Sequence, residues 1–164
     1  METRTESLVP LLRRGLLGLA ALTTAGITLE LITERHWTQR SQLIAWAALV
    51  VLALAIALLR GQPSATRVRT AQTIALLVVV AAVIGVWQHI AGNHEAGPLD
   101  YHYLQTWEGL SAASRWWLAA RKARGPSPPL APGALVQAAL CVLLAIVQHP
   151  ATVGKGGRTT LGAG

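Results

Sequence analysis

The sequence predicts an all-α membrane protein: a bundle of four transmembrane helices, with an amphipathic interfacial helix between the third and fourth spans. Three observations lead to this fold class. Of the 164 residues, 52% are hydrophobic and only 13% are charged, about half the charged share of a soluble domain. The apolar residues gather in four runs. The basic residues gather mainly between these runs, as they do where a bilayer sets the topology.

The four apolar runs predict spans at about 11–33, 42–59, 71–91 and 131–147. A helix crosses the hydrocarbon layer in about 20 residues, with a usual range of about 17–25. Only helices and closed barrels satisfy every backbone hydrogen bond in lipid, and runs rich in Leu and Ala without alternation favour helices. The first run could instead be a cleaved signal peptide, but its length and the lack of a clean Ala-x-Ala site favour a span.

Residues 1–150 are therefore expected to form one transmembrane domain, followed by a disordered glycine-rich tail over 151–164. With the N-terminus in the cytoplasm, eight basic residues lie inside and six outside. The short connection over 60–70 holds three arginines and no acid, which places it, and with it both termini, in the cytoplasm. The net charge of +7 does not indicate nucleic-acid binding, because these cations lie where lipid headgroups are met.

The long connection between the third and fourth spans contains the predicted interfacial helix, at about 101–123. One face of this segment holds residues at spacings of three or four: Leu104, Trp107, Leu110, Ser114 and Trp117. Tryptophan rings and cations on an amphipathic helix are typical of a segment in the headgroup layer, and a lid over a site is the alternative. The proline-rich stretch 126–129 ends the helix before the fourth span.

Polar residues occur at one end of the first and third spans, where ionisable groups are costly and therefore informative. They continue stripes of small residues at spacings of four, which share one helix face and suit close helix contact. These stripes are Gly26, Glu30 and Glu34 in the first span, and Ala81, Gly85, His89 and Asn93 in the third. Because both spans run in the same direction, their polar ends reach the same membrane surface.

The sequence therefore predicts a cluster of carboxylates and imidazoles at the outer end of the bundle. The candidate metal ligands are Glu30, Glu34, His89, Asn93 and His94. Glu and His bind divalent metals in helical bundles, although the Glu-x-x-His spacing of those sites is absent. A Glu–His pair can also relay protons, or join two helices by a hydrogen bond. All three interpretations stay open. No catalytic residue is predicted, and no cofactor beyond a divalent metal at this cluster.

Cys141 is the only cysteine, so the chain forms no internal disulfide. Because it lies in the fourth apolar run, we expect it to pack as a small apolar residue.

Several short motifs are shared with a known group of proteins. They are Glu34-Arg35-His36-Trp37, Gln42-Leu43-Ile44-Ala45-Trp46, Gly92-Asn93, Leu130-Ala131-Pro132-Gly133 and His149-Pro150, together with Glu30, Gly85 and His89. On these motifs the chain resembles a family of small bacterial four-span integral membrane proteins with no assigned function. The resemblance implies a multi-pass protein of the bacterial inner (cytoplasmic) membrane, and it supplies no activity. The family carries an acidic stretch after the Gly-Asn pair, where this chain has the less acidic 94–97.

These observations favour a non-enzymatic accessory or assembly component of the membrane, because no nucleophile–base pair or cofactor motif is present. One alternative is a metal-binding or proton-handling protein that uses the Glu/His cluster. Another is a subunit of a small transporter, which with four spans requires an oligomer. The expected partners are the lipid bilayer and either another membrane protein or a second copy of the chain, with no nucleic acid.

Overall fold

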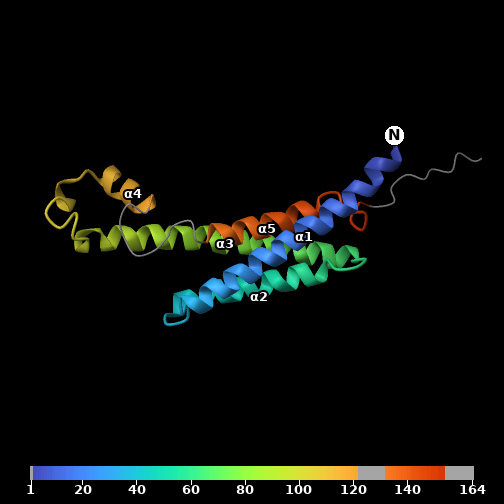
Figure 1. Cartoon of the computed structure of the whole chain (residues 1–164), viewed down its shortest axis with the longest axis horizontal. Helices are drawn as coiled ribbons and strands as arrows, with labels where there is room; N and C mark the ends of the chain where they lie inside the picture. Colours follow the sequence, from blue (N-terminus) through green and yellow to red (C-terminus); the bar gives the residue numbers. More distant parts are fainter. Residues whose placement is uncertain (1, 122–131, 154–164) are drawn as a thin grey trace, which may run out of the picture.

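The computed structural model describes residues 2–121 and 132–153, and this part of the chain is helical without strands (Figure 1). The helices are α1 (Glu2–Thr33), α2 (Leu43–Leu58), α3 (Ala65–Ala96), α4 (Ala112–Ala120) and α5 (Gly133–Ile146). Short 3₁₀ turns lie at η1 (Arg40–Gln42), η2 (Gly97–Leu99) and η3 (Trp107–Gly109). Within the described residues, α1, α2 with its preceding turn, and α3 are long and apolar enough to cross a membrane, whereas α5 is a shorter apolar helix.

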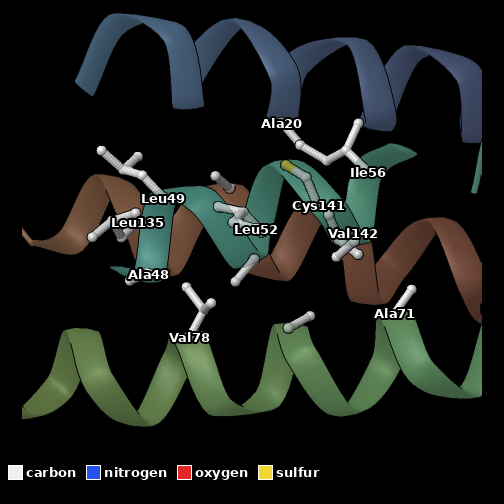
Figure 2. Packing of buried hydrophobic residues seen from close by; sticks show 14 of the residues in the cluster. Ala20, Ala48, Leu49, Leu52, Ile56, Ala71, Val78, Leu135, Cys141 and Val142 are labelled. Carbon is white, nitrogen blue, oxygen red and sulfur yellow. The ribbon is translucent and has the colours of Figure 1, made fainter. Parts of the chain in front are cut away.

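The helices α1, α2, α3 and α5 pack into a bundle in which α2 and α5 separate α1 from α3 (Figure 2). In Figure 1, α1 and α3 run in one direction, and α2 and α5 run in the opposite direction. The core is built largely from small side chains, among them the fully buried Ala20, Ala75 and Ala138. Such residues let helix backbones approach closely, and this close packing holds helices together where lipid removes the hydrophobic driving force.

Charged and titratable residues flank the apolar helices at the spacing that a bilayer requires. Arg40 precedes α2 and Arg60 follows it, while Arg69 and His89 bound the apolar part of α3. Each pair is separated by about 30 Å along its helix, which is the thickness of the hydrocarbon layer, about 30 Å. In α1, Glu30 lies about 25 Å along the helix from Arg13 and Arg14. Large apolar side chains cover the outward faces between these levels, as lipid contact requires.

The helix α3 is longer than a single span and extends beyond the bundle (Figure 1). Its 32 residues cover about 48 Å. The part beyond His89, the turns over 97–109 and α4 form a small domain-like extension, which we call the cap. At its centre Trp107 is 2% exposed and Asn93 is fully buried. The Asn93 Nδ2 donates a hydrogen bond to the Ala119 carbonyl at 3.2 Å, which ties α4 to α3.

The helix expected over 101–123 is shorter in the structure, where α4 covers only Ala112–Ala120. The Asp100 carboxylate accepts a hydrogen bond from the His102 amide at 3.0 Å, and the Ser111 hydroxyl accepts one from the Ser114 amide at 3.2 Å. These short polar side chains offer the backbone local partners that compete with a continuous helix. Turn chemistry therefore outweighs the apolar periodicity of this segment.

The long apolar helices also differ from the apolar runs in their bounds. The helix α1 begins at Glu2 rather than near residue 11, and α3 covers Ala65–Ala96 rather than 71–91. A helical backbone satisfies its own hydrogen bonds whatever side chains it carries, so helices continue into polar flanks. The apolar run marks only the part suited to lipid. The tail over 154–164 and the segment 122–131 lie outside the described residues.

Candidate functional site

A cavity of about 500 Å³ opens at the end of the bundle where α1 ends and α2 begins. Its walls come from the end of α1, the start of α2, the middle of α3 and the first residues of α5. The inner walls are apolar, with Ile27, Leu31, Ala48, Ala82 and Leu135 among the lining residues. The polar lining residues are Glu30, Glu34, His36, Ser41, Gln42, Gln88 and His89. The cavity thus joins an apolar interior to a polar, acidic mouth.

The cavity exists because α5 begins deeper in the bundle than the ends of α1 and α3. The first residues of α5 meet α3 at Gly85, where an added Cβ atom would lie 3.3 Å from two carbon atoms of the Pro132 ring. His89 lies one turn further out on α3. Since α2 and α5 hold α1 and α3 apart, the polar ends of α1 and α3 line the space beyond Pro132 from opposite sides.

Three of the five candidate residues come together in this cavity: Glu30, Glu34 and His89. No hydrogen bond joins Glu30 to His89 in the part of the chain that the structure describes. Within the same part, no group of three or more His, Cys, Asp and Glu side chains is arranged to hold a metal ion. The arrangement is therefore a polar cavity rather than a compact set of ligands.

The other two candidates, Asn93 and His94, belong to the cap. Asn93 is buried and bonded to α4. The His94 ring stacks on Trp116 with centroids 4.1 Å apart and planes 17° apart. Trp116 stacks in turn on Trp87 at 5.3 Å and 17°. Asn93 lies one turn beyond His89 on the same face of α3. It is nevertheless buried in the cap, where it contacts α4, and it is not among the residues that line the cavity.

His36 also lines the cavity; the sequence places it just beyond the first span, above Glu30 and His89, and favours an interfacial position over a ligand role. A turn at the end of α1 directs it inward. Arg35 adopts a left-handed conformation with φ of 49°, the Arg35 amide donates to the Ile32 carbonyl at 3.1 Å, and the His36 amide donates to the Leu31 carbonyl at 2.9 Å. This is a Schellman cap. Its sequence signal is weak because glycine usually holds the position of Arg35.

Contacts with α2 fix the position of this turn. The Trp46 indole donates a hydrogen bond to the His36 carbonyl at 2.7 Å, and the Trp37 ring lies 6.2 Å from the Trp46 ring. Burial lowers the pKa of the His36 imidazole below its usual value, and the neighbouring His89 lowers it further, whereas Glu34 and Glu30 act in the opposite direction. The imidazole of His36 is therefore electrostatically coupled to the other titratable groups of the cavity.

Among the described residues, neither carboxylate of the cavity, Glu30 or Glu34, has an ion pair. Both ion pairs among the described residues lie in the cap, between Asp100 and His102 and between Glu108 and Arg115. Within the part of the chain that the structure describes, no lysine or arginine lines the cavity. Glu30 and Glu34 are exposed at its mouth, and carboxylates beside low-dielectric walls concentrate a negative potential. Glu30 and Glu34 therefore present negative charge to the cavity mouth.

At the opposite end of the bundle, Arg13 contacts the end of α5. Its guanidinium donates to the Val147 and Gln148 carbonyls, at 3.2 and 3.0 Å, and so caps the C-terminus of α5. Burial, with a smaller contribution from Arg13, lowers the pKa of the neighbouring His149. Cys141 is buried in the core between these two ends, as Figure 2 shows.

No protein-family model, no curated protein and no solved structure matches this chain. The resemblance to a bacterial four-span family therefore stays an expectation. What the structure establishes is a helical protein with three long apolar helices compatible with a membrane protein. The role of the cavity has to be inferred from its own chemistry.

Proposed function

We propose that this chain is a four-span inner-membrane protein whose function is to bind a ligand, without catalysis, in the cavity at its outer end. The fourth span would be α5. Its 14 residues cover about 21 Å, less than the hydrocarbon thickness of about 30 Å. It lies between α1 and α3 and buries Ala138, Ala139 and Val142 completely. Packing against longer helices and local thinning of the bilayer can accommodate such a mismatch.

In the proposed topology the cavity and the cap face outward. Arg60, Arg67 and Arg69 surround the connection between α2 and α3. The positive-inside rule assigns such a connection to the cytoplasm. The ends of α1 and α3 would then reach the outer surface, and both termini would lie inside. The accessory role expected from the sequence is one form that a non-catalytic binding function can take.

Single-cysteine labelling in intact cells tests this topology. Cys141→Ser removes the native thiol, and Thr38→Cys, Gln62→Cys, Gln105→Cys and Val153→Cys each place one thiol at an exposed position. A membrane-impermeant maleimide should label positions 38 and 105 directly, and positions 62 and 153 only after permeabilisation. Labelling of 105 and 153 from the same side would show that α5 does not cross the membrane.

The observation that carries the binding function is the cavity with its two unpaired carboxylates. Its volume of about 500 Å³ lies within the range of small-molecule sites, about 300–1,000 Å³. Apolar walls with a few convergent polar groups are the usual composition of such sites. Catalysis would require a nucleophile beside a base or an equivalent constellation, and the sequence contains no motif for one.

Native mass spectrometry of protein purified from its own membranes tests binding. Ala45 lines the cavity and is only partly buried, so Ala45→Leu fills the cavity without overpacking the core. Ala47 is exposed on the same helix, and Ala47→Leu is the matched control. A small molecule should be retained by the native chain and by Ala47→Leu, and lost from Ala45→Leu. No retained molecule, or equal retention in both variants, would contradict the binding function.

Proton handling at the same cavity is the second candidate. The supporting observation is the electrostatic coupling of His36 with His89, Glu34 and Glu30, since protonation of one group changes the affinity of the others for protons. Carbon-13 spectra of labelled histidine across a pH series would follow both imidazoles. A titration of His36 that does not change with His89→Gln would exclude this candidate.

A further inference from the structure

We infer that the ligand of the outer cavity is an organic cation, a protonated amine that carries an apolar body. The inference rests on the proposed binding function and names the chemical class of its ligand. It combines three properties of the cavity: an unpaired pair of carboxylates, an apolar interior, and neutral polar groups that accept hydrogen bonds.

The charge of the cavity selects a cation. Glu30 and Glu34 lie four residues apart on α1, so their side chains are neighbours on one helix face. Among the described residues, neither has an ion pair, and no arginine or lysine lines the cavity. A single ammonium group placed at the mouth can approach both carboxylates, and charge-assisted hydrogen bonds of this kind are stronger than neutral ones. An anion would meet two negative charges there instead.

The apolar interior selects an organic cation over a simple ion. On α1, Ile27 lies about one turn inward of Glu30. Ile27 and Leu31 both line the cavity with apolar side chains. Ala48, Ala82 and Leu135 extend this wall from three further helices. A hydrated inorganic ion would leave these surfaces unused, whereas an apolar body attached to the amine would remove them from water. The described residues also offer no group of three ligands suited to a metal ion.

The neutral polar groups at the mouth suit a donor-rich headgroup. Gln88 presents an amide oxygen that accepts hydrogen bonds, and a neutral imidazole at His36 presents one accepting nitrogen. The Gln42 side-chain oxygen already accepts from the Thr38 hydroxyl and the Gln39 amide. An ammonium group is a donor with no acceptor of its own. The mouth can therefore satisfy the N–H groups that do not face the two carboxylates.

Two sources can supply this chemistry. One is a free amine from the outer aqueous phase, and the other is the headgroup of an aminophospholipid. Glu30 lies about 25 Å along α1 from the arginines at the opposite end, close to the edge of the hydrocarbon layer. Both sources reach this depth, so the experiment has to separate them.

The probe is benzylamine, titrated at pH 7 into protein held in dodecyl maltoside, a detergent without charge or amine. Isothermal titration calorimetry should show saturable binding of one benzylamine per chain. Benzyl alcohol and benzoate, which share the ring but not the positive charge, should bind at least about tenfold more weakly. Equal affinity for benzyl alcohol would overturn the inference, and this comparison needs no variant.

Paired variants locate the site. The exchange Glu30→Gln with Glu34→Gln keeps the shape of two exposed side chains and removes both charges, and it should weaken benzylamine binding by at least about tenfold. Glu108→Gln, which neutralises an exposed carboxylate of the cap, should leave binding unchanged. Loss of binding in Glu108→Gln, or full binding in the Glu30/Glu34 double variant, would place the amine elsewhere and overturn the assignment.

Short-chain phospholipids separate the two sources. Dihexanoyl-phosphatidylethanolamine should compete with benzylamine if the natural ligand is a lipid headgroup, with dihexanoyl-phosphatidylglycerol as the amine-free control. Benzylamine binding without this competition assigns the site to a free amine. Competition by both lipids alike would overturn the requirement for an amine.

The failure of this inference is distinguishable from failure of the binding function. A retained neutral or anionic molecule that Ala45→Leu displaces would keep the binding function and reject the amine. Absence of both a retained molecule and benzylamine binding would reject both proposals.

Discussion

Replacement of Gly97 by alanine is expected to destabilise the cap through a single steric conflict. Gly97 begins η2 with φ of −54° and ψ of −44°, a right-handed conformation that any residue adopts. The backbone therefore poses no obstacle to a side chain at this position. A Cβ atom there would overlap the six-membered ring of Trp107, at its Cε2, Cζ2 and Cη2 atoms. The conflict is with a rigid ring that fills the centre of the cap.

The magnitude follows from the burial of that ring. Trp107 is 2% exposed, so it cannot move aside without losing contacts. Overpacking a core by a methyl group costs about 1–3 kcal/mol, and losing a buried aromatic side chain altogether costs about 3–5 kcal/mol. We expect Gly97→Ala to cost about 2–4 kcal/mol, between these limits. Gly92→Ala is the matched control, because an added Cβ at Gly92 meets no atom within 4 Å.

Hydrogen exchange measured by mass spectrometry in detergent is the assay. Local opening of the cap exposes the amides of α4, and a loss of about 2 kcal/mol speeds their exchange by about 30-fold. The amides of α2 should exchange as before. Gly92→Ala should leave α4 unchanged or slow its exchange slightly, since alanine favours helix over glycine by about 0.5–1 kcal/mol.

A double variant tests the cause. Trp107→Leu removes the ring that the new methyl group meets, so Gly97→Ala should cost much less in that background than in the native chain. Exchange in Gly97→Ala equal to that of the native protein would refute the packing of Trp107 on Gly97. Strictly additive effects of the two substitutions would also refute it.

Three further predictions concern the two ends of the bundle. Arg13→Gln removes the charged donor to the last carbonyls of α5 and should lower the unfolding temperature, at a cost of about 1–2 kcal/mol. Because burial and Arg13 lower the pKa of His149 in the folded chain, the unfolded chain binds this proton first as pH falls. The contribution of His149 to stability is therefore complete above its usual pKa of about 6.5 and decreases as pH falls below that value; thermal unfolding between pH 7.5 and 5.5 measures it. Trp46→Phe removes the donor to the His36 carbonyl and should cost about 1 kcal/mol, with faster proteolysis of the turn after α1.

Each of these predictions has its own control. Arg14→Gln removes a cation beside Arg13 that makes no hydrogen bond to the described residues, and it should leave the unfolding temperature nearly unchanged. His149→Gln should flatten the pH dependence of unfolding; an equally steep dependence in that variant would assign it to another group. Trp37→Phe keeps the indole bond of Trp46 and should leave the turn protected. Equal proteolysis in Trp37→Phe and Trp46→Phe would contradict the role of that bond.

The candidate site could be predicted in part. The chemistry of Glu30, Glu34 and His89 and their shared membrane level follow from the lengths of the apolar runs and from i+4 spacing, which are local properties of a helix. Among the described residues no hydrogen bond joins Glu30 to His89, and α2 and α5 lie between α1 and α3. Spacing along one helix carries no information about which helix lies beside it.

The sequence by itself determined the helical class, the apolar lengths and the end of the bundle at which polar groups gather, since each depends on neighbours within a few residues. Only the tertiary structure decided the rest. A left-handed Arg35 turns His36 into the cavity, and the packing of Trp107 and α4 commits Asn93 and His94 to the cap. Pro132, just before α5, packs against Gly85 in the middle of α3, and this contact forms one wall of the cavity. These features depend on contacts between residues that are distant in the chain, and no local pattern encodes them.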